Sequence, residues 1–242
     1  MNSIKNQAEI KAYARTHLEG CYLIYMLIFI IYTISVVLLS QIAVDENNRY
    51  KLLIAITNFV ISVFTGILVA MFKGGLCNVS VKICAGDTPV VKDLFYNYIA
   101  NSRNSFFTYA LPVFIQNLFL IPAYTYIFRY GADRPADLFK VLILSGIGFV
   151  GYYLVTLGFF PVYYLFVDFP EKTPKEIIKL SFWLMKGHKI RLLLLEMSFI
   201  PIFIISMFTM GIGLLWVVPY YQTSLAYFYM NLLSNRTGTE SD

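Results

Sequence analysis

Apolar residues occur along this chain in long runs, separated by shorter polar segments. Each run is close to 20 residues or longer, and about 20 apolar residues in a helix cross the roughly 30 Å hydrocarbon core of a bilayer. Backbone amides in hydrocarbon must be bonded within the protein, and the runs lack the alternation of barrel strands, so the pattern predicts helices. Six membrane-spanning helices are predicted, at residues 20–43, 52–72, 105–128, 139–167, 192–209 and 214–233.

The last two predicted spans divide one apolar stretch, residues 192–233. As a single helix this stretch would be roughly 63 Å long at about 1.5 Å per residue, about twice the thickness of the hydrocarbon core. Residues 209–213 contain two glycines, which can take positive φ and make a tight turn. We therefore predict a helical hairpin. The alternative is a five-span chain with one long fifth helix and an external C-terminus.

Polar segments before alternate spans predict short amphipathic helices at residues 3–17, 88–102 and 173–187. Each would precede one hairpin, which gives three similar units and a weak sequence repeat of about 85 residues. Unrelated amphipathic helices before apolar spans would give the same impression. Thr173, Pro174 and Glu176 fit the N-cap, N1 and N3 positions of a capping box. The predicted fold is one all-α integral membrane domain over residues 1–242, with six transmembrane helices as three hairpins.

The third amphipathic helix separates lysines from apolar side chains. We expect it to lie in the headgroup layer, with its apolar face in lipid and its lysines toward anionic phosphates. This arrangement could serve regulated binding of lipid or a partner, or simple anchoring, which is the commoner role. The lysines expected to contact headgroups are Lys172, Lys175, Lys179 and Lys186.

Composition and charge support the membrane assignment and give an orientation. The chain is 58% hydrophobic and 14% charged, against roughly 45 to 50% and about 25% in soluble domains. The predicted topology puts fourteen Lys and Arg residues on one side of the membrane and five on the other. Because the cytoplasmic side carries the excess of basic residues, we expect both termini in the cytoplasm. Cys21, Cys77 and Cys84 are expected to be free thiols on that side.

Motifs of known enzyme chemistry are missing from the sequence. Its two histidines form no zinc-ligand cluster, and it contains no nucleophile elbow, phosphate loop or dinucleotide-binding motif. We therefore expect no catalytic site, no metal or other cofactor, and no nucleic-acid partner.

Polar residues in and near the spans are the candidate binding residues. Glu196 stands inside the fifth span, where a carboxylate costs on the order of 2.5 to 3.5 kcal/mol at the bilayer centre and so needs a partner. It could form a proton or cation site, or reach basic side chains at the cytoplasmic face, which we favour. Gln116 and Asn117 could join helices or line a cavity. The full candidate set is Glu196, Arg191, His188, Gln116 and Asn117.

Small residues at helical spacing predict close helix packing. In the second span they recur every four residues, and in the fourth span three glycines are spaced by three and seven residues. The two sets are Ser62, Gly66, Ala70 and Gly74, and Gly148, Gly151 and Gly158.

A set of spaced residues marks the C-terminal third of the chain: Pro174, Ser181, Met185-Lys186-Gly187, Arg191, Ser198-Phe199-Ile200, Gly211-Ile212-Gly213, Trp216, Pro219-Tyr220, Ala226 and Tyr229. This pattern resembles the bacterial membrane family catalogued as domain of unknown function 975. The resemblance covers about residues 168–233 and departs at Pro201, where the family pattern has Gly. The helix before the fifth span and residues 223–229 are more loosely similar to the membrane domain attached to some bacterial glycerophosphodiester phosphodiesterases, a part without a hydrolase site. These resemblances imply a fold and a bacterial cytoplasmic membrane, and no activity.

Three functions are compatible with these features. The leading hypothesis is a membrane protein without enzyme activity that binds lipid, an amphiphile or a protein partner. A small-solute or peptide transporter is the alternative, suggested by the polar residues, the prolines and the repeat. A lipid-headgroup enzyme is the third. We expect anionic membrane lipids as partners, and a second membrane protein or another copy of the chain as further candidates.

Overall fold

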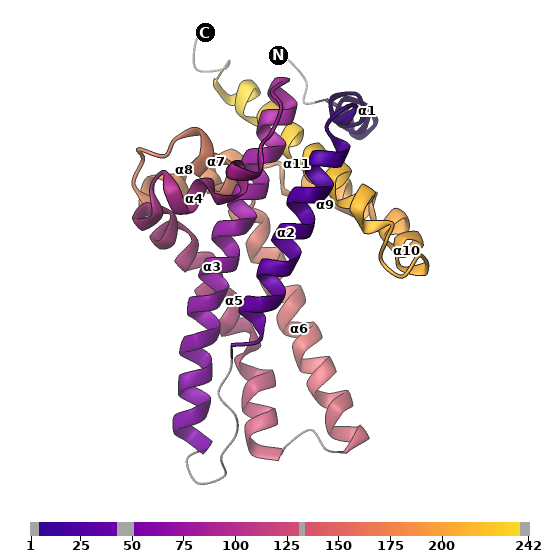
Figure 1. The fold of residues 1–242 in the computed structure, drawn as a ribbon. Helices are drawn as coiled ribbons and strands as arrows, with labels where there is room; N and C mark the ends of the chain where they lie inside the picture. The colour runs from indigo at the N-terminus through magenta and orange to yellow at the C-terminus, as the bar shows by residue number, and fades with distance from the viewer. Residues whose placement is uncertain (1–4, 43–50, 131–133, 238–242) are drawn as a thin grey trace.

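The computed structural model describes residues 5–42, 51–130 and 134–237, and these residues form helices and no strands. Two long hairpins make up the body of the molecule, and shorter helices gather at one end of it (Figure 1). In chain order the elements are α1 (Gln7–Leu18), α2 (Tyr22–Ser40), α3 (Lys51–Ala85), the 3-10 helix η2 (Val91–Phe95), α4 (Tyr96–Ile99), α5 (Ser102–Tyr130), α6 (Pro135–Phe159), α7 (Val162–Asp168), α8 (Pro174–Met185), α9 (Lys189–Met197), α10 (Ile200–Phe208) and α11 (Leu214–Thr237).

Five helical segments among the described residues are long and apolar enough to cross a membrane. They correspond to α2, α3, α5, α6 with α7, and α9 with α10. The predicted all-helical fold is therefore confirmed, and the length and composition of these helices fit a membrane protein. The predicted six spans in three hairpins are not, because α11 is outside this set and the third hairpin is shorter than the other two. In Figure 1 helices α3, α5 and α6 extend toward the bottom of the view, whereas α10 projects sideways higher up.

Helix α3 is longer than predicted. The second span was expected to end at Phe72, but the helix continues without a break to Ala85. The reason is that Gly74 and Gly75 allow close packing instead of ending the helix. A Cβ on Gly75 would lie 1.9 Å from the backbone oxygen of Leu94, so η2 rests directly on this part of α3. The predicted topology places Lys73 in the connection after the second span, whereas the structure places it inside α3.

The short helices agree with the prediction in two of three cases. α1 covers most of residues 3–17, of which residues 3 and 4 lie outside the described residues. α8 has the expected capping box, in which the Thr173 backbone N–H donates to Glu176 Oε2 at 2.9 Å. These hydrogen bonds hold the pKa of Glu176 below its usual value. Residues 88–102 do not form one helix. They contain the 3-10 helix η2 and the short helix α4.

The apolar face of α8 packs against protein and not lipid. Ile177, Leu184 and Met185 are fully buried in the main core. The expected lipid contact is therefore wrong for Ile177 and Leu184, whereas Trp183 of the same helix is 37% exposed. Lys175, Lys179 and Lys186 are exposed, and their contact with headgroups stays a prediction. Lys172 lies 5.4 Å from the centroid of the Phe169 ring.

The predicted small-residue ridges are confirmed as packing surfaces. Ser62 of α3 donates to Asn117 Oδ1 of α5 at 2.9 Å. A Cβ on Gly66 would lie 2.8 Å from Val113, also on α5. A Cβ on Gly148 of α6 would lie 2.3 Å from the backbone oxygen of Phe119 on α5. The glycines thus let α5 pack closely on both α3 and α6.

Candidate functional site

Glu196 holds three helices together. Its carboxylate, on α9, accepts hydrogen bonds from the Tyr153 hydroxyl on α6 and from the Tyr221 hydroxyl on α11, the latter at 3.1 Å. Its partners are therefore tyrosines, in place of the basic side chains that we favoured from the sequence. Arg191 is exposed on the same helix. Because it accepts hydrogen bonds from two tyrosine hydroxyls, the main role of this carboxylate is to hold α6, α9 and α11 together.

Lys73 and three tyrosines form a second polar group among the apolar helices. The Lys73 ammonium lies 4.6 Å from the centroid of the Tyr163 ring, a cation–π contact. It is also within electrostatic range of the hydroxyls of Tyr32 and Tyr152. Lys73 itself is exposed, although it belongs to the apolar segment Leu53–Cys84. We call Lys73, Tyr32, Tyr152 and Tyr163 the lysine–tyrosine cluster.

Sequence reasoning missed this cluster because Lys73 was assigned to a loop. Its three tyrosines come from α2, α6 and α7, far from Lys73 in the sequence, so no local motif joins them. One local signal was present. The small-residue ridge from Ser62 to Gly74 keeps its helical spacing past Lys73, which indicates an unbroken helix there.

Aromatic side chains fill the centre of the bundle beside the cluster. The Tyr163 ring stacks on Tyr109 with centroids 5.0 Å apart, and Tyr164 stacks on Tyr229 at 5.0 Å. Tyr109, Tyr164 and Tyr229 are at most 2% exposed. The interior behind Lys73 is therefore closely packed with rings.

Asn117 and Gln116 are separated by the structure. Asn117 is buried between α3 and α5, where it accepts from Ser62 and donates to the Val113 carbonyl oxygen at 3.0 Å. Gln116 is exposed on α5. Asn117 therefore joins helices, the commoner of its two expected roles.

His188 lies where α8 ends and α9 begins. It is half-buried, and burial lowers its pKa, reinforced by the nearby positive charges of Arg236 and Arg191. The candidates His188 and Arg191 are thus close together, whereas the hydrogen bonds of Glu196 and Asn117 go to other helices.

The depressed pKa of His188 predicts a loss of stability in acid. The unfolded chain takes up this proton first, near pH 6.5, so stability falls as pH drops below that value. We expect the melting temperature in detergent to fall between pH 7.5 and pH 5.5, and less steeply in His188→Gln. Thermal unfolding of both proteins at matched pH values measures the two slopes. An equal dependence of the melting temperature on pH in the two proteins would show that His188 does not cause the loss of stability in acid.

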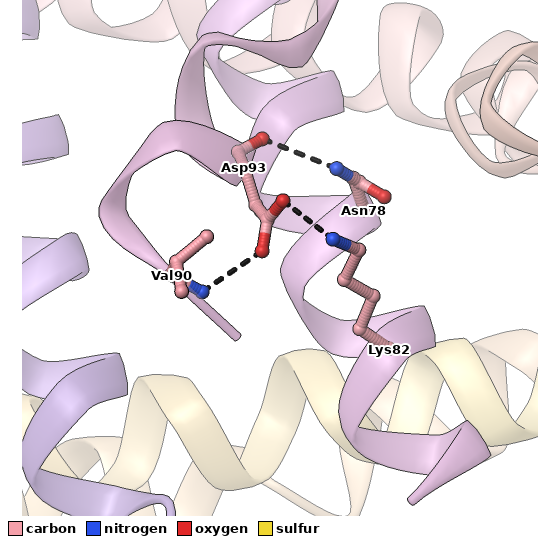
Figure 2. Close-up of polar contacts among 4 residues, drawn as sticks. All are labelled: Asn78, Lys82, Val90 and Asp93. Carbon is pink, nitrogen blue, oxygen red and sulfur yellow. Dashed lines mark hydrogen bonds and ion pairs between the residues drawn. The ribbon is translucent and has the colours of Figure 1, made fainter. Parts of the chain in front are cut away.

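Asp93 makes a polar cluster that supports the fold (Figure 2). Its carboxylate pairs with Lys82 of α3 at 2.6 Å and accepts from the Val90 backbone N–H at 2.9 Å. Asn78 of α3 donates to the Asp93 carbonyl oxygen at 3.3 Å. Both carboxylate oxygens thus have partners, so this group fixes η2 on α3 and is a poor candidate for acid–base chemistry.

Metal and thiol chemistry find little support in the part of the chain that the structure describes. No group of three or more His, Cys, Asp or Glu residues there could hold a metal ion. All three cysteines are free, as predicted, and Cys77 and Cys84 are buried.

Comparison with known proteins gives one match. A family model described as Protein of unknown function (DUF975) matches residues 138–236. No curated protein and no solved structure matches the chain, and the likeness to the phosphodiesterase membrane domain is not supported. The matched region runs from α6 to α11 and contains Glu196 with both of its tyrosine partners, whereas Lys73 lies outside it. The resemblance of the C-terminal part of this chain to the family of proteins of unknown function DUF975 is therefore confirmed over residues 138–236.

Proposed function

We propose that this membrane protein binds an anionic, phosphate-bearing lipid at the lysine–tyrosine cluster. The observation that carries the proposal is Lys73, an exposed cation within a segment apolar enough to span the membrane. Ionisable residues in such segments are costly and commonly mark sites for ligands or ions.

The charge of Lys73 calls for an anion. Among the described residues, the ion pairs join Lys82 to Asp93 and Lys140 to Asp137, and no carboxylate pairs with Lys73. A lipid phosphate would supply the negative charge at the depth of a membrane helix. The hydroxyls of Tyr32 and Tyr152 can donate hydrogen bonds to phosphate oxygens, and the Tyr163 ring already orients the ammonium.

Binding is better supported than transport. A transporter needs a polar path near the middle of the membrane. Next to the cluster stand stacked rings that are almost fully buried, among them Tyr109 and Tyr164. This packing favours a ligand held at the side of the bundle over a solute that passes through it.

Removal of the positive charge of Lys73 tests the proposal. We expect phosphatidylglycerol to raise the melting temperature of the purified protein in neutral detergent more than phosphatidylcholine does. A ligand at 100 times its Kd stabilises by about 2.7 kcal/mol. Lys73→Gln should weaken phosphatidylglycerol binding about tenfold, or about 1.4 kcal/mol, and Lys73→Arg should retain most of it. Lys179→Gln, which removes an exposed lysine from α8, is the matched control.

Two results would contradict the proposal. One is a phosphatidylglycerol response in Lys73→Gln that equals that of the unchanged protein. The other is a response that disappears when Lys175, Lys179 and Lys186 are all changed to Gln, which would move lipid recognition to the exposed face of α8.

A further inference from the structure

The tip of the α10–α11 hairpin is the most exposed apolar part of the described chain. Phe208 is 85% exposed and Met210 is 97% exposed, and Met207 and Ile212 are also largely exposed. From Leu192 to Leu233 the sequence contains a single charged residue, Glu196. A projecting tip of this composition needs an apolar environment.

The turn itself is built for an environment without water. The backbone N–H groups of Thr209, Met210, Ile212 and Leu214 all bond to carbonyl oxygens of the turn or of the end of α10. The Gly213 N–H donates to the Thr209 hydroxyl at 2.8 Å. A loop in water has no need of so many internal partners, whereas backbone groups in hydrocarbon must be bonded within the protein.

Helix α1 marks the headgroup level at the base of this hairpin. Lys11 donates to the Ser198 carbonyl oxygen at 3.1 Å, and its ammonium lies 4.4 Å from the centroid of the Phe199 ring. The Arg15 guanidinium lies 5.7 Å from the centroid of Tyr220, on the other arm. The outer face of α1 exposes polar and charged side chains, so we expect α1 to lie at the membrane surface, in contact with water and headgroups. Its cations therefore fix both arms near the membrane surface.

The length of the hairpin beyond these contacts is too short to cross. α10 has 9 residues, which span about 14 Å at about 1.5 Å per residue. The hydrocarbon core is about 30 Å thick. The tip can therefore reach about the middle of the bilayer. Figure 1 agrees, because α10 projects from the side of the bundle at the end that holds both chain termini.

We propose that the α10–α11 hairpin is re-entrant. It enters the hydrocarbon from the face that carries α1 and both described chain ends, contacts the acyl chains of that leaflet with its tip, and turns back without crossing. Only α2, α3, α5 and α6 then cross. Because four crossings and six crossings both leave the two ends on one side, reporters at the termini cannot separate these topologies, and the tip must be probed directly.

Cysteine accessibility at the tip tests this proposal. The probe is Met210→Cys in a Cys21→Ser background, labelled with a membrane-impermeant maleimide. Matched controls are Ala136→Cys at the opposite end of the bundle and Lys175→Cys on α8, both exposed. We expect Ala136→Cys to react on one side of the membrane and Lys175→Cys on the other. Met210→Cys should lose labelling from both sides and regain it after denaturation in detergent.

A second measurement gives the depth of the tip. With Trp183 and Trp216 changed to Phe and Met210 changed to Trp, the protein has a single tryptophan, which lies at the tip. Lipids brominated near the ends of their chains should quench it more than lipids brominated near the headgroup. Phe139→Trp, at the far end of α6, should show the opposite order.

Each alternative has its own signature. Labelling of Met210→Cys from the side of Ala136, with quenching by shallow bromines, would show a crossing hairpin. Labelling from the side of Lys175 would show a hairpin in water. Either result would overturn the re-entrant assignment. Met210 touches little of the fold, so its replacements leave folding intact.

Discussion

Gly75→Ala is expected to lower the free energy of unfolding by about 3 kcal/mol, at the upper end of the cost of overpacking. The new Cβ would lie 1.9 Å from the backbone oxygen of Leu94 and 2.6 Å from its carbonyl carbon. Backbone atoms cannot rotate away as a side chain can, so η2 would have to move off α3. The melting temperature in detergent, followed by size-exclusion chromatography after heating, measures the loss.

Two other glycines provide controls for Gly75→Ala. A Cβ on Gly74 meets the ends of side chains, Asn97 Nδ2 and the Tyr109 hydroxyl, which can move, so Gly74→Ala should cost less. A Cβ on Gly146 meets nothing within 4 Å, and alanine has the better helix propensity by about 1 kcal/mol. Gly146→Ala should therefore be neutral or slightly stabilising. Similar losses in all three variants would contradict contact with η2 as the cause of the cost, because helix propensity alone favours alanine at each position.

Lys82→Met is expected to destabilise the protein by about 2 to 3 kcal/mol. The change leaves the Asp93 carboxylate, whose side chain is only 9% exposed, without its cation. Breaking a buried pair costs about 3 to 5 kcal/mol, and the 38% exposure of the Lys82 side chain reduces that figure because water reaches one end of the pair. Thermal or denaturant unfolding in detergent measures the loss.

The matched control for Lys82→Met is Lys140→Met. Lys140 pairs with Asp137 at 4.0 Å and its side chain is 59% exposed, so this change should stay within about 0.5 kcal/mol. A Lys82→Met, Asp93→Asn double variant should lose less than the sum of the two single changes, because each single change leaves one charge behind. Simple additivity would mean that the two charges are not coupled.

Local signals in the sequence were enough to predict most of the long helices and the start of α8. The capping box at Thr173 fixed the start of α8, and long apolar runs predicted helices that fit a membrane. The turn at residues 209–213 was also predictable, although only one of its two glycines, Gly211, takes positive φ. The other positive φ belongs to Met210. Gly213 is needed for space, because a Cβ there would lie 2.9 Å from the Cβ of Ser206.

Local signals were ambiguous where two environments are equally apolar. The buried face of α8 has the same periodicity whether it meets lipid or protein, and only the fold shows that it meets protein. Gly74 and Gly75 could end a helix or admit a neighbour, and only the position of η2 decides between them. Because the predicted span ended before these glycines, Lys73 was predicted to lie in the following connection.

Sequence alone determined that this chain is helical and belongs in a membrane, because both properties follow from the order of neighbouring residues: apolar runs of spanning length, and caps that begin helices. The tertiary structure decided which polar groups meet. Tyr153 and Tyr221 reach Glu196 from helices on either side of it in the chain, and Tyr163 reaches Lys73 from another. Such contacts depend on how distant helices pack, and no short stretch of sequence encodes that.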